Sequence, residues 1–148
     1  MISDQILSLI PQQAPFRFVD TIDDVGEEHI LGTYQFDEKA WFYQGHFPNF
    51  PITPGVILIE CMAQIGLVGL GISLLLREQM MEPVRPIFTS AEVEFLQPVY
   101  PGDRVQVRSD KIYYRFKKLK CMTIMRDESG KTLCKGTLSG MMVTKNDE

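Results

Sequence analysis

The sequence contains few of the residues that build metal centres and disulfide frameworks. Its 148 residues include three cysteines and two histidines. The cysteines, Cys61, Cys121 and Cys134, are odd in number and have neither CxxC nor metal-ligand spacing. We therefore expect reduced thiols, no bound metal ion and no other cofactor.

The chain also lacks a basic-then-apolar segment at its start and an excess of positive charge. The first absence argues against a secretion signal, so a cytoplasmic location is expected. The formal net charge of −4 at pH 7 argues against nucleic acid as a partner of the whole surface. Repeats and low-complexity linkers are absent too, so residues 1–148 are expected to form one domain.

The uncharged run of residues 61–76 is short for a membrane-spanning helix. A span needs about 20 apolar residues. The run includes Gln64 and Ser73, and Glu60 directly precedes it. A helix that is apolar on all sides is equally typical of a buried core. We therefore expect a core helix and no membrane span.

The rest of the pattern predicts one long helix with strands around it. The helix is expected over residues 55–78, and its small residues at three- or four-residue spacing would let a sheet approach closely: Ala63, Gly66, Gly69 and Ser73. Further expected elements are a short helix at 3–10, strands at 16–25 and 29–36, a short helix at 37–44, an extended segment at 47–54, and strands at 84–99, 104–116, 118–127 and 132–143. The last three strands predict an antiparallel meander, and the whole predicts an α+β fold with a curved antiparallel sheet against one helix.

A charged residue on this apolar helix points to chemistry, because a buried carboxylate is costly unless it is used. The apolar neighbours of Glu60 should raise its pKa, so that it holds a proton near neutral pH, and Gln64 at i+4 can hydrogen-bond to it. Gly55 should present its N–H at the start of the helix, where a carbonyl oxygen gaining negative charge can bind. His46 is suited by its pKa to accept a proton.

An oxyanion donor, a protonated carboxylic acid and an imidazole base allow proton chemistry beside a carbonyl group. A β-hydroxy thioester is a natural substrate for these groups. The base removes the α-proton, the donor holds the enolate-like oxygen, and the acid protonates the departing hydroxyl. Loss of water then gives a trans-2-enoyl product without a metal ion or an organic cofactor.

Residues 45–60 read GHFPNFPITPGVILIE. They contain a spaced pattern made of Gly45-His46-Phe47-Pro48, Pro51, Pro54-Gly55-Val56 and Glu60. This pattern resembles the active-site signature of the 3-hydroxyacyl-ACP dehydratases of type II fatty acid synthesis, in particular the FabZ-like branch. Residues 14–20 (APFRFVD) and 96–103 (LQPVYPGD) are similar to other parts of that family.

The resemblance implies a hot dog fold, in which the sheet wraps the central helix, and (3R)-3-hydroxyacyl chains on acyl carrier protein as substrates. It implies a homodimer in which His46 of one protomer, the base, faces Glu60 of the other, the acid. Many members assemble further into trimers of dimers, that is, a homohexamer. Glutamate at position 60 resembles the plain dehydratases rather than the dehydratase-isomerases. Carried over by position, the N–H groups of Gly55 and Val56 form the thioester-carbonyl site. With Gln64, predicted from its spacing to Glu60, and Phe47 of the matching motif, they are the expected substrate-binding residues.

Some residues depart from the pattern of the family. Asn49 and Phe50 stand where members often have glycine and a basic residue, and Thr53 replaces a common methionine. The loop 12–15 (QQAP) lacks the His-Arg-Tyr style of many members. None of these positions belongs to the His–Glu pair, so the reaction class is unaffected, while chain-length preference and pathway stay open.

Two other functions remain open on the sequence. One is an acyl-thioester hydrolase on the same fold, and the other is a non-catalytic subunit that binds acyl-ACP. The basic run 115–120 (RFKKLK) has two interpretations, a solvated strand–turn face or a docking patch for an acidic carrier protein. Arg77 and Arg85 are equal candidates for such docking.

Overall fold

The computed structural model describes residues 2–80 and 83–144. Its central element is one helix from Gly55 to Arg77. This helix consists of α2 (Gly55–Ala63), the π-helical segment η2 (Gln64–Gly69) and α3 (Leu70–Arg77). It begins after Pro54, whose carbonyl accepts the N–H groups of Ile57 and Leu58. The helix expected over residues 55–78 is confirmed.

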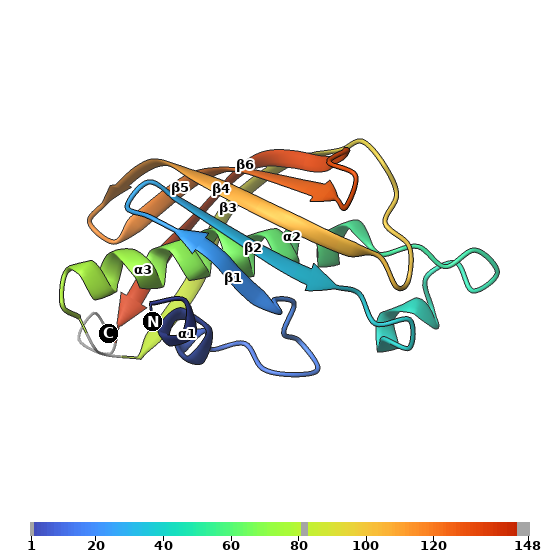
Figure 1. Ribbon diagram of the computed structural model, residues 1–148, viewed down its shortest axis with the longest axis horizontal. Coiled ribbons are helices and arrows are strands. Elements are labelled where there is room, and N and C mark those ends of the chain that lie inside the picture. Colours follow the sequence, from blue (N-terminus) through green and yellow to red (C-terminus); the bar gives the residue numbers. More distant parts are fainter. Residues whose placement is uncertain (1, 81–82, 145–148) are drawn as a thin grey trace.

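A six-stranded antiparallel sheet covers this helix (Figure 1). The strand order is β1-β2-β4-β5-β6-β3, so β4, β5 and β6 form the expected meander and β1 and β3 are the edges. The strands are β1 (Thr21–Val25), β2 (His29–Gln35), β3 (Val84–Phe95), β4 (Arg104–Arg115), β5 (Lys118–Asp127) and β6 (Thr132–Thr144). A short helix, α1 (Ile2–Leu9), packs against β1 and α3.

The core lies between the helix and the concave face of the sheet. Along β4, Arg104 and Gln106 are exposed while Val105 and Val107, which alternate with them, are buried. This is the alternation of a sheet with one covered face. All helix residues from Cys61 to Leu75 are buried. The helix is long and apolar enough to cross a membrane, but 78% of its most apolar stretch is buried inside the protein, as in a core helix.

The small residues of the helix mark its closest approach to the sheet. A Cβ atom at Gly66 would lie 3.0 Å from Ser109 of β4 and 3.2 Å from Thr123 of β5. A Cβ atom at Gly69 would lie 2.8 Å from Ile30 of β2. The expected role of these glycines in close packing is therefore confirmed.

The strand expected over 16–25 begins only at Thr21. The N–H of Asp20 still donates to the carbonyl of Thr33 in β2 at 2.8 Å, but at Phe16 and Phe18 the backbone is paired with a side chain instead of a neighbouring strand. The N–H of Phe18 donates to Oε1 of Gln64 at 2.6 Å, and the carbonyl of Phe16 accepts from Nε2 of Gln64 at 3.0 Å. The strand prediction therefore gave the wrong backbone partner for Phe16 and Phe18.

Two predictions between β2 and the helix are also wrong in part. The helix expected over 37–44 is only a 3₁₀ turn, η1 (Trp41–Tyr43). The segment expected to be extended from residue 47 begins with a tight turn, in which the N–H of Phe50 donates to the carbonyl of Phe47 at 2.8 Å. Pro48 suits the second position of such a turn. The chain is extended at Pro54, which has φ −58° and ψ 137°.

Candidate active site

Glu60 lies in α2, little more than one turn from the helix start, and is half-buried. Its Oε2 accepts a hydrogen bond from Nε2 of Gln64 at 2.9 Å. Burial raises the pKa of the Glu60 carboxyl above its usual value, and the hydrogen bond from Gln64 opposes that rise in part. Both the direction of this shift and the Glu60–Gln64 contact agree with the sequence-based expectation.

Gln64 fixes the orientation of this carboxyl group. It is fully buried at the start of the π-helical segment, and its Oε1 accepts the N–H of Phe18. The amide nitrogen therefore has to face the carboxyl group, and it donates to both Glu60 and the carbonyl of Phe16. Because Oε2 of Glu60 is used as an acceptor, a proton on this carboxyl belongs on Oε1.

His46 lies in the loop between η1 and α2. Its Nδ1 is 2.9 Å from the carbonyl oxygen of Ile52. A carbonyl can only accept, so Nδ1 carries the hydrogen and the lone pair on Nε2 is left to accept a proton. The loop is anchored by Thr53, whose hydroxyl is 2.6 Å from the Tyr43 hydroxyl and whose N–H donates to the carbonyl of Val99 at 2.7 Å.

His46, Phe47 and Gly55 line one pocket of about 480 Å³. Gly55 begins the helix there, and the Phe95 ring would lie 3.0 Å from a Cβ atom at that position, so glycine leaves room against the ring. The N–H groups of Gly55 and Val56 have no acceptor within the helix and are available to a ligand. Val56 itself is 72% exposed and is not among the residues that line this pocket.

Glu60 lines a different pocket, of about 190 Å³. The two linings have no residue in common among the described parts of the chain. They also involve opposite ends of the edge strand β3, with Phe95 at the His46 pocket and Pro86, Ile87 and Phe88 at the Glu60 pocket. A single protomer therefore brings His46 together with Gly55 but does not place Glu60 in the same pocket.

Of the residues that line the Glu60 pocket, only Glu60 was a predicted site residue, and the other polar side chain there was missed. Gln12, in the loop after α1, contributes to this lining. The only sequence signal at this position was the departure of the loop 12–15 from the family pattern. Its proximity to Glu60 depends on how the N-terminal segment packs on the helix, which no local pattern encodes.

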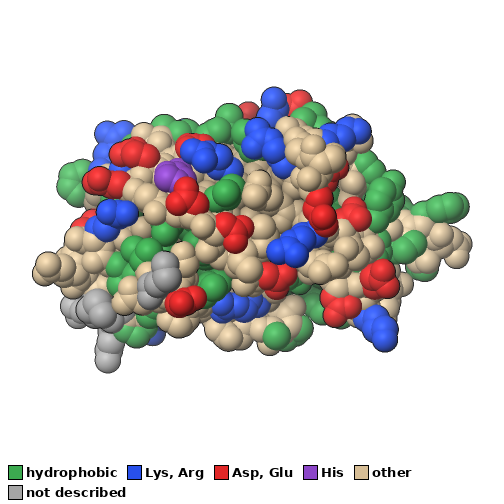
Figure 2. Space-filling model, viewed as in Figure 1, with side chains coloured by type: hydrophobic (Ala, Val, Ile, Leu, Met, Phe, Trp, Pro, Cys, Tyr) green, Lys and Arg blue, Asp and Glu red, His purple; other side chains and the backbone are tan. Residues whose placement is uncertain are grey.

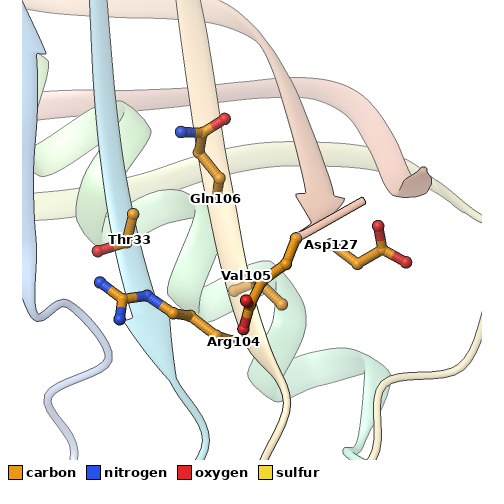
Figure 3. Close-up of a pocket in the computed structure, with 6 residues that line it drawn as sticks. Thr33, Arg104, Val105, Gln106 and Asp127 are labelled. Atoms are coloured by element: carbon orange, nitrogen blue, oxygen red, sulfur yellow. The ribbon is translucent and has the colours of Figure 1, made fainter. Parts of the chain in front are cut away.

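A third pocket lies on the opposite face of the sheet and holds none of the predicted residues. It has a volume of about 300 Å³ and includes Arg104, Gln106 and Asp127 (Figure 3). Arg104 and Gln106 point away from the core because Val105 between them is buried. In residues 2–80 and 83–144, no group of three or more His, Cys, Asp or Glu side chains could hold a metal ion.

A long central helix wrapped by an antiparallel sheet defines the class of hot dog proteins. The model of the FabA-like domain matches residues 10–137. The chain belongs to this FabA-like family.

Relatives of this chain carry the name 3-hydroxyacyl-[acyl-carrier-protein] dehydratase FabZ. The protein from Petrotoga mobilis is 37% identical over 103 residues, which cover 69% of this chain and 70% of the relative. The protein from Nitratidesulfovibrio vulgaris is 31% identical over 148 residues, which cover 97% of this chain and 92% of the relative.

Solved structures confirm the fold. The dehydratase heterocomplex ApeI:P from Xenorhabdus doucetiae contains a chain with a TM-score of 0.76 and 16% identity, and the match covers 96% of this chain and 93% of that one. A hypothetical thioesterase with coenzyme A from Streptococcus pneumoniae has a TM-score of 0.62 and 14% identity, covering 83% of this chain and 84% of that one. At these identities the likeness concerns the hot dog fold alone.

Proposed function

We propose that this protein dehydrates (3R)-3-hydroxyacyl chains on acyl carrier protein to trans-2-enoyl chains, in fatty acid synthesis or a related acyl pathway. The observation that carries the proposal is the Glu60 carboxyl, held by Gln64 with one oxygen left over for a transferable proton. Its raised pKa favours the protonated acid that the reaction needs. Relatives named FabZ, which match most of the chain, support the same reaction.

In the proposed mechanism the thioester carbonyl binds at the helix start, where the Gly55 N–H, beside that of Val56, stabilises negative charge on its oxygen. Nε2 of His46 removes the α-proton, and the electrons of that C–H bond move toward the carbonyl oxygen. They return to form the C2–C3 double bond as the C3–O bond breaks. Oε1 of Glu60 protonates the departing hydroxyl, which leaves as water.

The starting protonation state returns when the proton held by His46 passes to the carboxylate of Glu60. No net proton is gained or lost over the cycle, because His46 takes one proton and Glu60 supplies one. The Phe47 side chain, which lines the same pocket as His46, would contact the part of the substrate that carries the thioester.

Two copies of the chain would bring His46 and Glu60 together. The edge strand β3 is paired only with β6 among the described strands, so its other edge is open. An open strand edge lined by apolar side chains is a typical protein interface. Large apolar side chains near this edge and in the His46 loop are exposed: Phe47, Phe50, Val56, Ile87, Phe88 and Phe95. The loop projects from one end of the molecule, and apolar side chains gather at that end (Figures 1 and 2).

Antiparallel pairing of two β3 strands would place the start of each strand beside the end of the other. Ile87 in the Glu60 pocket and Phe95 in the His46 pocket are separated by ~26 Å of extended strand. A two-fold axis between the strands exchanges these ends, so the His46 pocket of one protomer would meet the Glu60 pocket of its partner. We therefore propose a homodimer with two shared active sites, which could assemble further into a hexamer.

The proposed macromolecular partner is an acyl carrier protein, which is acidic. We define the basic hairpin as Arg115, Lys117, Lys118 and Lys120, at and beside the β4–β5 turn. Phe116 at its tip is 93% exposed. This surface suits docking of an acidic protein on a chain whose formal net charge is −4. The three buried free cysteines suit the reducing cytoplasm, where we place the reaction.

The proposed function is tested by incubating the purified protein with 3-hydroxyacyl-ACP and following enoyl-thioester absorbance. Glu60→Gln keeps an acceptor for Gln64 but cannot donate a carboxylic proton, so kcat should fall by about 10² or more. Unchanged turnover in that variant would refute the assigned mechanism. Release of free thiol would identify a hydrolase instead, and tight acyl-ACP binding without turnover would identify a non-catalytic subunit.

A further inference from the structure

Arg17 fixes the backbone of the loop that carries Gln12, beside the Glu60 pocket. Nη1 of Arg17 donates to the carbonyls of Gln12 and Ile10 at 3.2 Å and 3.4 Å, and Nη2 donates to the carbonyl of Leu7 at 2.7 Å. One guanidinium group thus ties the loop to the end of α1. With its backbone fixed in this way, the Gln12 side chain lines the Glu60 pocket.

The Oε1 atom of Gln12 is buried and has no hydrogen-bond partner within the described structure. A buried acceptor without a donor costs about 1–3 kcal/mol, and such atoms are rare in native proteins. Because Gln12 lines the Glu60 pocket, a rotation of its amide group that turns this unpaired oxygen into the pocket would let a bound group donate to it.

The polar groups of this pocket match one kind of ligand group. Gln12 offers an acceptor oxygen, and a protonated Glu60 offers a hydrogen on Oε1, because Oε2 already accepts from Gln64. The other lining residues are apolar: Ala63, Leu67, Val68, Pro86, Ile87, Phe88, Gly140 and Met142. A hydroxyl group donates one hydrogen bond and accepts another, so it satisfies both polar groups at once.

We propose that Gln12 is a substrate-binding residue that accepts a hydrogen bond from the 3-hydroxyl group of the acyl chain. This inference rests on the proposed dehydratase function and adds a hydroxyl-recognition residue to it. The hydroxyl hydrogen points to Oε1 of Gln12, which turns an oxygen lone pair toward the acid proton of Glu60. When the C3–O bond breaks, the same two residues hold the water that leaves.

The test measures binding of two unreactive ligands to the full-length protein by calorimetry. Both are pantetheine amides with the same acyl chain length, one with a 3-hydroxyl group and one saturated at that position. Replacing the thioester by an amide makes the α-proton too weakly acidic for dehydration. The wild type should prefer the hydroxylated ligand by about tenfold, the usual effect of one hydrogen bond.

Gln12→Met keeps the size of the side chain and removes the acceptor, so it should weaken this preference, to which Glu60 still contributes, while leaving the affinity for the saturated ligand unchanged. Gln12→Leu serves as a second variant if the first folds poorly. Gln13→Met is the matched control, because Gln13 is exposed on the same loop and bonds to the Ile10 carbonyl. The control should keep the wild-type preference.

Equal weakening of both ligands by Gln12→Met and Gln12→Leu, or an unchanged preference, would overturn the role of Gln12. A parallel assay with 3-hydroxyacyl-ACP separates the two proposals. If the wild type forms enoyl product but the variants keep their ligand preference, only the Gln12 inference fails. If the wild type forms no enoyl product, the proposed function fails, and the hydroxyl role of Gln12 fails with it.

Discussion

At the scale of single residues, the carboxyl group of Glu60 links catalysis to stability. Burial raises its pKa, so the folded protein binds this proton more tightly than the unfolded chain does. A group of this kind stabilises the fold fully below its unfolded pKa, about 4.3, and the stabilisation is lost as the pH rises through the folded pKa. The acid that the reaction needs is therefore a source of instability at higher pH.

Glu60→Gln should raise the melting temperature relative to the wild type at pH 8, because the neutral amide never has to be buried as a charge. The difference should shrink as the pH falls, because the wild-type carboxyl of the folded protein takes up its proton more readily than that of the unfolded chain. Thermal melts at several pH values measure it. A melting temperature that stays below the wild type at pH 8 would contradict the raised pKa.

Gln64 has two separable effects, one on stability and one on acidity. Gln64→Met removes the hydrogen bond that lowers the pKa of Glu60, so the high-pH limb of the activity profile should move to higher pH. It also leaves the buried N–H of Phe18 and the carbonyl of Phe16 unpaired, which should cost about 1–3 kcal/mol each.

The pH–activity profile and urea unfolding measure these two effects. Gln106→Met is the control, because Gln106 is exposed on the outer face of the sheet and should change neither quantity. A high-pH limb that stays in place, or moves to lower pH, would mean that Gln64 does not tune the acid.

The residues of the helix start were predictable because their chemistry is local. Glu60 and Gln64 are one turn apart on one helix, and Gly55 is the residue at its start, so spacing alone predicts their contacts. Gln12 could not be found this way. Its place beside Glu60 depends on Arg17 fixing the loop and on the packing of the N-terminal segment, both of which join distant parts of the sequence.

At the scale of helices and strands, most elements follow the sequence pattern. The meander of β4, β5 and β6 was predictable from alternation and from turn residues such as Gly130, which has φ +89°. The start of β1 was not, because the Gln64 side chain binds the backbone at Phe16 and Phe18 in place of a strand. An alternating pattern indicates which face is buried but not which group pairs with the backbone.

The pairing of β6 with the edge strand β3 requires glycine at position 136. A Cβ atom there would lie 2.0 Å from the carbonyl oxygen of Glu92 and 2.7 Å from Cα of Val93. Both are backbone atoms of β3, so they cannot move aside without disturbing the strand pairing. Gly136→Ala should therefore lower the free energy of unfolding by about 3 kcal/mol or more.

Urea unfolding measures this change, and Gly45→Ala is the control, since a Cβ atom at Gly45 meets nothing within 4 Å. Gly136→Ala should also weaken self-association, because β3 forms the proposed dimer edge. Equal stability of the two alanine variants would show that β3 does not lie against β6 as described.

At the scale of the whole molecule, the proposed function requires a second copy of the chain and a carrier protein. The family resemblance implied a shared site, and the separate pockets of His46 and Glu60 supply a physical reason for it. The sequence pattern of one chain could not predict this geometry. Whether the two pockets face each other depends on how the edge strands of two protomers pair.

The basic hairpin should matter only for substrates on the carrier protein. Lys118 and Lys120 lie on the same face of β5, because Leu119 between them is buried. Replacing both by glutamate should raise KM for 3-hydroxyacyl-ACP by about tenfold at low salt, with a smaller effect at high salt. KM for a 3-hydroxyacyl-pantetheine thioester should not change, and an equal rise for both substrates would argue against docking at this surface.

The central claim, that each active site uses His46 of one protomer and Glu60 of its partner, is tested most directly by mixing two inactive variants. His46→Ala and Glu60→Gln are unfolded together in equal amounts, refolded, and assayed with 3-hydroxyacyl-ACP. Random pairing makes half of the dimers mixed, and each mixed dimer has one intact site, so about one quarter of wild-type activity should return. If His46 and Glu60 act within one chain, the mixture will stay as inactive as either variant alone.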